Sequence, residues 1–158
     1  MKFAVCAYNW SMSHQLIKVE TDSDWRDYHS LRRTVLWEAR GRSDYDQNHP
    51  DEYLADNHPL LLKLNGQSIG TTRLDDVGDG TGAVRLVAIA PDMQRRGHGR
   101  VLSRQVDDYA RRLGIKILHV NAVREAVGYY EKMGWKADIW NEAELTDLRQ
   151  MSKCIVIA

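Results

Sequence analysis

The chain has 158 residues, and its 22 basic and 22 acidic side chains leave it without net charge at pH 7. This length suits one domain with a sizeable core, which we expect to span residues 1–158. Balanced charge creates no overall field that would draw the protein to nucleic acid or to a membrane surface, so we expect neither as a partner.

The lack of a recognisable targeting signal and the use of cysteine favour a cytoplasmic protein. No apolar run approaches the roughly 18–20 residues that a membrane span needs. The apolar stretch 3–7 is too short for the core of a signal peptide. Cys6 and Cys154 lie near opposite ends of the chain in apolar stretches. We expect two buried free thiols, with a disulfide between terminal strands as the alternative.

The first half of the chain alternates helical and strand-like patterns. Asn65-Gly66, between two apolar runs, is a strong hairpin signal. In chain order, we predict a strand over 14–20, a helix from a cap at Asp22 or Ser23 to Gly41, a polar loop over 43–58 with one short helix after Pro50, and two strands over 59–64 and 68–74.

The second half predicts a strand–helix–strand unit with a parallel crossover across residues 84–120. The expected elements are a strand over 84–90, a helix from the turn at 97–99 to Gly114, a strand over 115–120, a helix over 124–133 closed by Gly134, and strands over 135–140 and 153–157. The whole order is β-α-α-β-β-β-α-β-α-β-β, which is an α/β pattern.

The segment Gln94-Arg95-Arg96-Gly97-His98-Gly99 joins a strand to a helix. Such a turn leaves backbone N–H groups unpaired at the positive end of the helix dipole, an arrangement that binds phosphate-like anions. Gly97 and Gly99 let the backbone approach an anion and adopt positive φ. Arg95, Arg96 and Arg100 add positive charge. The alternative is an ordinary turn with solvated arginines.

This turn is similar to the Gln/Arg-x-x-Gly-x-Gly/Ala signature of the GNAT superfamily of acyl-CoA N-acyltransferases. A second segment, Ala126-Val-Gly-Tyr-Tyr-Glu-Lys-Met-Gly-Trp135, resembles the family's Ala-x-x-Phe-Tyr-Glu-Lys-x-Gly-Phe motif. The order of elements also matches over nearly the whole chain. The resemblance implies the GNAT fold, a mixed central sheet of about six to seven strands with helices on both faces.

The resemblance further implies that acetyl-CoA is the co-substrate and that no metal is needed. In the family, the segment that matches Gln94, Arg95, Arg96, Gly97, His98, Gly99 and Arg100 cradles the pyrophosphate of coenzyme A. Main-chain groups at Val87, Ala88 and Ile89 would pair with the pantetheine arm. Asn121 could bind the cofactor or cap the next helix; the family's asparagine falls two residues later, where this chain has Val123.

Tyr130 stands where the family places a tyrosine that protonates the departing thiolate. A phenol with a pKa near 10 is a plausible donor to a thiolate whose thiol has a pKa of about 8.5. The alternative is a packed core tyrosine, because Tyr130 shares a helical face with Val127 and Met133.

A general base is harder to find. Arg85 stands near the strand position where many relatives carry a glutamate, and arginine cannot act as a base. If Arg73 and Arg85 on adjacent strands point to the same face, they could bind a substrate carboxylate; the alternative is that they are solvated or ion-paired. The substitute bases in neighbouring segments are Glu38, Asp44, Asp46, His49, Asp75 and Asp76.

The predicted activity is acetyl transfer to a primary amine by direct attack in a ternary complex. No cysteine lies in either motif, which argues against an acetyl-cysteine intermediate. The alternative is a non-catalytic acyl-CoA sensor. The acceptor would be a small-molecule or protein amine; the acidic stretch 43–58 suits a cationic amine, although a solvated face explains it equally well. A homodimer through the C-terminal strands is implied only by resemblance.

Overall fold

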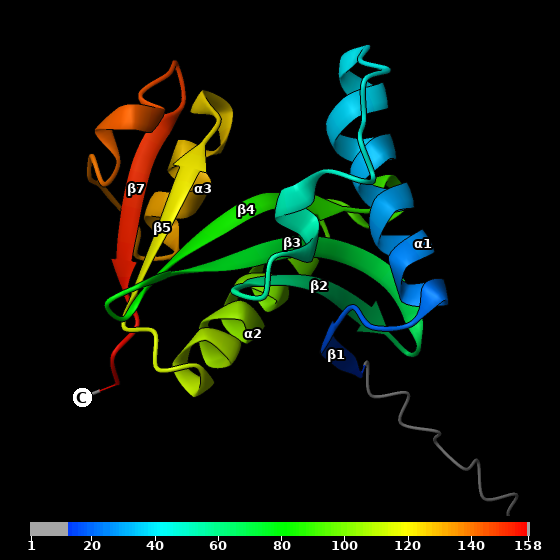
Figure 1. The fold of residues 1–158 in the computed structure, drawn as a ribbon, viewed down its shortest axis with the longest axis horizontal. Coiled ribbons are helices and arrows are strands. Elements are labelled where there is room, and N and C mark those ends of the chain that lie inside the picture. Colours follow the sequence, from blue (N-terminus) through cyan, green and yellow to red (C-terminus); the bar gives the residue numbers. More distant parts are fainter. Residues whose placement is uncertain (1–12, 158) are drawn as a thin grey trace, which may run out of the picture.

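The computed structural model describes residues 13–157. Seven strands form one sheet in the order β1-β2-β3-β4-β5-β7-β6 (Figure 1). They are β1 (His14–Lys18), β2 (Asn57–Leu64), β3 (Gln67–Gly78), β4 (Thr81–Ile89), β5 (Ile117–Ala122), β6 (Lys136–Ala137) and β7 (Arg149–Cys154). The pairing of β4 with β5 is parallel and the others are antiparallel, so the mixed α/β sheet and the parallel crossover are confirmed.

Helices cover both faces of the sheet, as expected. Neighbouring residues of β2 point to opposite sides, because side chains alternate along a strand. Leu60 and Leu62 belong to the core beneath α2 (His98–Arg112), which contributes Leu102 and Val106. Leu61 packs in a separate cluster beneath α1 (Asp22–Arg32). In Figure 1 these two helices lie on opposite sides of the sheet.

The N-terminal helix begins one residue earlier than predicted. The Thr21 hydroxyl, rather than Asp22 or Ser23, caps α1 by accepting the N–H of Asp24 at 3.1 Å. The helical path continues through a π-helical turn (Arg33–Trp37) and a 3₁₀ turn (Glu38–Arg40) and ends at Gly41, where φ is +72°. The short helix after Pro50 is also present, as a 3₁₀ turn (Pro50–Tyr53).

The C-terminal strands differ from the prediction. The expected strand over 153–157 lies instead at β7, and the expected strand over 135–140 is reduced to β6. Gln150 of β7 is buried because its side chain bonds the backbone of Trp140 and Asn141. A polar residue in a buried position conceals the apolar alternation that would have marked this strand.

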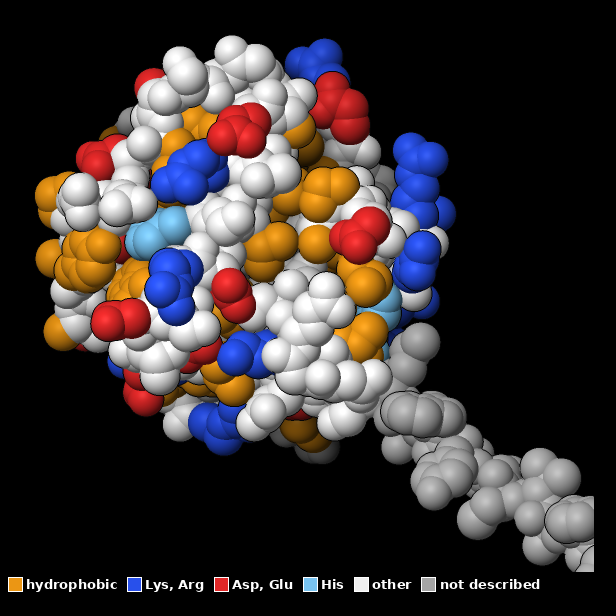
Figure 2. Space-filling view, turned by 90° about the vertical axis from the view of Figure 1, so that its right-hand side faces the viewer, with side chains coloured by type: hydrophobic (Ala, Val, Ile, Leu, Met, Phe, Trp, Pro, Cys, Tyr) orange, Lys and Arg blue, Asp and Glu red, His pale blue; other side chains and the backbone are white. Residues whose placement is uncertain are grey.

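Cys154 is an exposed free thiol, so the prediction that it is buried is wrong. Ile155, the next residue, takes the core position. Cys6 lies outside the described residues. No helix within residues 13–157 is long and apolar enough to cross a membrane. On the face drawn in Figure 2, acidic and basic side chains are interspersed, in keeping with the zero net charge.

Candidate active site

A cleft opens where β4 and β5 separate. The two strands pair only from Thr81 to Val84 on β4, although β4 continues to Ile89. Beyond Val84, no strand of the described residues pairs with this edge of β4, and the edge faces a cavity of about 380 Å³. Both strands and α3 (Val127–Lys132) contribute to its walls. An extended ligand could therefore lie along the main chain of β4 as an additional strand would.

A β-bulge sharpens the separation of the strands. Thr71 of β3 pairs with Ala88, but Arg73 pairs with Arg85, so β4 carries one extra residue at this point. Leu86 lies in the bulge with a φ of +58°, a left-handed conformation that is uncommon for a leucine. Its side chain is 40% exposed and lines the cleft.

The three strand residues predicted to hold pantetheine have mostly internal side chains. Ala88 is buried, Ile89 packs against the core, and Val87 lines the cleft. Any contact that Ala88 makes with a ligand would therefore be through its main chain, as the resemblance implied.

The glycine-rich turn leaves a row of donors free. No backbone N–H from Gly97 to Arg100 meets an acceptor within the described chain, and Val101 forms the first bond of the helix, to the Gly97 carbonyl. Gly97 caps α2 with a φ of +85°. The turn therefore fits a phosphate group, which unpaired N–H groups and the helix dipole together attract.

The two glycines of the turn have different reasons to be glycine. A Cβ on Gly97 would meet nothing within 4 Å, so its positive φ is the constraint. Gly99 has no such φ, and its Cβ would lie 2.8 Å from the Tyr129 hydroxyl. Gly99 thus makes room for a tyrosine of α3, a role that the sequence pattern did not reveal.

The polar side chains of the turn differ in burial and in the partners that they contact. The Gln94 amide donates to the Ile89 carbonyl at 3.0 Å. His98 is buried with its Nδ1 2.9 Å from Nε2 of His14, so only its backbone is at the turn surface. Arg95 and Arg96 are exposed, and neither has a carboxylate oxygen within 4.0 Å in residues 13–157.

Asn121 does not cap a helix. Val123 occupies the position before the following 3₁₀ turn (Arg124–Ala126), so the capping alternative is wrong. The Asn121 amide donates to Oε2 of Glu144 at 3.0 Å and lines the cleft. Its Oδ1 is buried without a partner among the described residues, and an unsatisfied acceptor of this kind suits a ligand donor.

Tyr130 lines the cleft from α3 while its ring packs on Trp135, with the ring centroids 5.5 Å apart. Burial raises the pKa of its phenol to about 12, and nearby Tyr129 adds to the shift. The side chain is therefore protonated at neutral pH. Tyr130 thus has the core packing that the sequence pattern presented as the alternative to a proton donor, and it also reaches the cleft.

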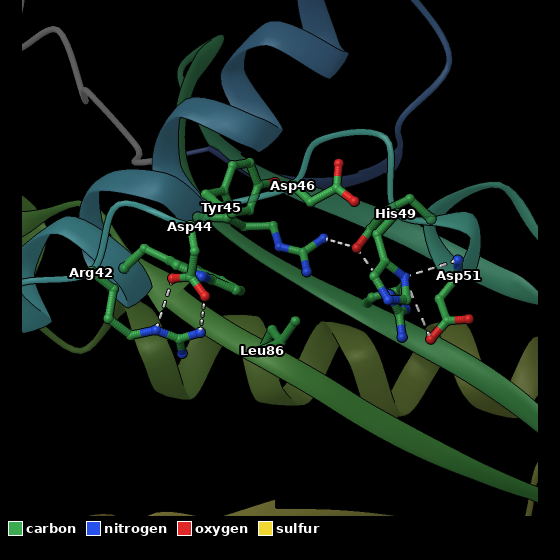
Figure 3. A pocket seen from close by; sticks show the side chains of 11 residues that line it. Arg42, Asp44, Tyr45, Asp46, His49, Asp51 and Leu86 are labelled. Carbon is green, nitrogen blue, oxygen red and sulfur yellow. Dashed lines mark hydrogen bonds and ion pairs between the residues drawn. The ribbon is translucent and has the colours of Figure 1, made fainter.

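A second cavity, of about 390 Å³, adjoins the cleft on the side of α1. The two cavities share the side chains of Trp37, Arg42 and Leu86. Figure 3 shows the paired Arg42 and Asp44 on one side of this cavity, with Leu86 below them on β4. His49 and Asp51 lie on the other side.

A chain of alternating charges crosses the sheet beside this cavity. Arg73 donates to Glu52 at 2.9 Å and to Asp75 at 2.7 Å. Arg85 lies 3.4 Å from Asp75. The alternative that Arg73 and Arg85 each pair with carboxylates is thus confirmed. In order across the sheet, the members are Arg32, Glu52, Arg73, Asp75, Arg85 and Glu144.

These ion pairs reduce the set of candidate bases. Burial alone would raise the pKa of Glu52, but the guanidinium groups of Arg32 and Arg73 hold it below its ordinary value. A hydrogen bond from Arg85 lowers the pKa of Glu144. Asp75 is fixed by Arg73 through both of its oxygens.

Only some of the substitute bases line the second cavity. Asp44 does, but its hydrogen bonds with Arg42 lower its pKa. Asp46 and His49 also line the cavity. The three other candidates, Glu38, Asp75 and Asp76, are not among the lining residues. Within residues 13–157, no group of three or more His, Cys, Asp or Glu side chains could hold a metal ion.

Comparison with known proteins gives the family to which this fold and cleft belong. The model of the acetyltransferase (GNAT) family matches residues 20–135. The chain belongs to this family. It is an acyltransferase that uses an acyl-CoA donor and an amine acceptor.

Individual relatives are distant in sequence. A Bacillus subtilis (strain 168) protein, provisionally named an acetyltransferase, is 24% identical over 120 residues, which are 75% of this chain and 81% of that protein. An acyl-CoA N-acyltransferase from Pseudomonas aeruginosa has a TM-score of 0.76 at 20% identity, covering 91% of this chain and 100% of its own. The PaiA N-acetyltransferase from Thermoplasma acidophilum, solved with coenzyme A, has a TM-score of 0.71 at 15% identity, covering 90% and 99%.

Proposed function

We propose that the protein transfers the acetyl group of acetyl-CoA to a primary amine by direct attack in a ternary complex. The observation that carries this proposal is that two cavities adjoin at Leu86, one lying between β4, β5 and α3 and the other lined by charged side chains. When bound, acetyl-CoA supplies the activated thioester. The turn from Gln94 to Arg100 would hold its pyrophosphate, and the main chain of residues 87–89 would align its pantetheine arm.

Proton movements can be assigned to residues on either side of the junction. The acceptor amine must lose a proton before or as its nitrogen attacks, and Asp46 and His49, together with Asp51 beside His49, are groups in the second cavity that could take it. In this structure Nδ1 of His49 accepts the N–H of Asp51 at 3.2 Å, and Oδ1 of Asp46 accepts the N–H of Asn48 at 2.9 Å, so the proton would go to Oδ2 of Asp46 or to Nε2 of His49. As the C–S bond breaks and the C–N bond forms, Tyr130 donates its phenolic proton to the sulfur.

Calorimetric titration with acetyl-CoA tests the donor site. The native chain should bind with micromolar affinity, whereas an Arg95→Glu, Arg96→Glu variant should bind at least tenfold more weakly, because two charges near the pyrophosphate are reversed. An Arg26→Glu, Arg112→Glu variant reverses the same number of exposed charges elsewhere and should bind like the native chain. Absence of binding by the native chain would contradict the proposal.

Release of free thiol tests turnover and separates an enzyme from an acyl-CoA sensor. Butane-1,4-diamine, butylamine and 4-aminobutanoate are matched acceptors that differ only at the far end. Thiol release should depend on an added amine, and Tyr130→Phe should reduce it. Binding of acetyl-CoA without release by any amine in a wider panel would favour the sensor alternative.

A further inference from the structure

A third cavity, of about 210 Å³, lies beside the glycine turn and is strongly cationic. Its walls come from α2, from the end of α3 and from β7. The lining residues are Arg100, Ser103, Arg104, Lys132, Met133 and Lys153. Four of these six side chains are basic, and none of the lining residues is acidic. In a chain of zero net charge, this is a local concentration of one sign.

Most of these charges are uncompensated. Lys153 is paired with Asp107 at 2.5 Å. By contrast, Arg100, Arg104 and Lys132 have no carboxylate oxygen within 4.0 Å in the part of the chain that the structure describes. Like charges held close together repel one another, and a bound anion with more than one negative charge relieves that repulsion. The cavity therefore suits a phosphate group.

The cavity is at a suitable distance from the turn for a second part of the same ligand. Arg100 belongs both to the turn and to the cavity wall. Arg104 follows four residues later, about 6 Å further along the helix. Coenzyme A carries its pyrophosphate on the 5′-oxygen of a ribose and a third phosphate on the 3′-oxygen of the same ring. Because one ribose carries both groups, a pyrophosphate held at the turn leaves the third phosphate close to the cavity that Arg100 shares with the turn.

We propose that this cavity binds the 3′-phosphate of the acyl-CoA donor through Arg104 and Lys132, with Arg100 between the two phosphate sites. Guanidinium and ammonium groups form charge-assisted hydrogen bonds to phosphate oxygens. The protein consequently distinguishes coenzyme A from 3′-dephospho-coenzyme A. The inference rests on the proposed function, because it takes the pyrophosphate to be held at the turn.

Calorimetry with these two compounds, which differ by one phosphate, tests the assignment on the full chain. The native protein should bind 3′-dephospho-coenzyme A at least tenfold more weakly than coenzyme A. An Arg104→Gln, Lys132→Gln variant should bind both compounds alike, with the affinity that the native protein has for the dephospho compound. An Arg112→Gln, Lys136→Gln variant removes the same charge outside the cavity and should retain the native discrimination.

The outcomes separate this inference from the proposed function. Equal affinity of the native protein for both compounds would overturn the 3′-phosphate site and leave the donor site intact. Retention of the tenfold discrimination by the Arg104→Gln, Lys132→Gln variant would overturn the assignment to these residues. Failure of the native protein to bind either compound would overturn the donor site as well. Circular dichroism of each variant establishes that it is folded.

Discussion

At the scale of single residues, the two glycines of the turn are required for different reasons, one for its backbone conformation and the other for a side-chain contact. Gly97 must adopt a φ of +85°, whereas Gly99 must leave space for the Tyr129 hydroxyl. A signature with two glycines presents both positions as equivalent. Only the placement of α3 against the turn reveals that they are not.

Substitution by alanine should distinguish the two positions. Gly97→Ala should lower the free energy of unfolding by about 1–2 kcal/mol, because an L side chain in the left-handed region is strained. Gly99→Ala should cost less, since the obstructing atom is the end of a side chain that is 40% exposed and can shift. Urea denaturation measures both values.

The matched control is Tyr129→Phe, which removes the hydroxyl that the new Cβ would meet. In that background Gly99→Ala should have a smaller effect, while the effect of Gly97→Ala should be unchanged. Equal costs at the two glycines in both backgrounds would contradict this account of the turn.

Tyr130 provides the catalytic prediction at this scale. Tyr130→Phe keeps the ring on Trp135 but removes the acid, so kcat should fall by about 10²-fold or more while coenzyme affinity is unchanged. Because the pKa of Tyr130 is raised to about 12, its ionisation should not limit the rate between pH 6 and about pH 10. Steady-state thiol release measures the rate, and unchanged kcat would exclude the role.

At the scale of secondary-structure elements, ion pairs join segments that no local pattern connects. Arg32 and Glu52 are 20 positions apart, and Arg85 and Glu144 are 59 apart. Sequence reasoning placed Arg73 and Arg85 on adjacent strands and left their partners open. It missed Glu52 and Glu144, because the periodicity of an element shows which face a charge is on but not which distant carboxylate meets it.

The stability of the protein should depend on each member of the buried part of this chain of charges. Glu52→Gln leaves Arg32 and Arg73 without their shared carboxylate, and the free energy of unfolding should fall by about 3–5 kcal/mol. Asp44→Asn disturbs a pair on the surface and should leave the denaturation midpoint unchanged. Similar midpoints for the two variants would show that the buried network contributes little.

At the scale of the whole molecule, the sequence predicted the mixed sheet apart from the bounds of its last two strands, the helices on both faces, the turn before α2 and the place of Tyr130 on α3. The reason is that apolar periodicity and glycine punctuation are local signals. The second cavity escaped prediction, since Trp37, His49 and Leu86 meet there only after folding. The bulge at Leu86 had no signal at all, because leucine is an unusual residue for positive φ.

Four histidines give the folded protein a common response to pH. Burial lowers the pKa of His14, His29, His58 and His119 below the ordinary histidine value of about 6.5. Below about pH 6.5 the unfolded chain therefore binds more protons than the folded chain, and stability should fall as the pH falls. Above about pH 7 these groups are neutral in both states and should contribute no slope.

Urea denaturation between pH 8 and pH 5 measures this response. His119→Gln removes one of the four groups and should reduce the slope below pH 6.5. Destabilisation caused by the carboxylates with lowered pKa values, such as Glu52, belongs to a lower range, below about pH 4.5. A midpoint that stays constant down to pH 5 would contradict the expectation.

β4 and β5 are paired over only four residues, so few backbone hydrogen bonds join the two parts of the sheet. Directly after these residues, Arg85 of β4 forms an ion pair with Glu144, which lies in the 3₁₀ turn Glu142–Glu144 before β7. Dissolved salt weakens attraction between partly exposed charges. Raising the ionic strength should therefore weaken the contact between Arg85 and Glu144, whereas the backbone pairing of β4 with β5 should be unaffected.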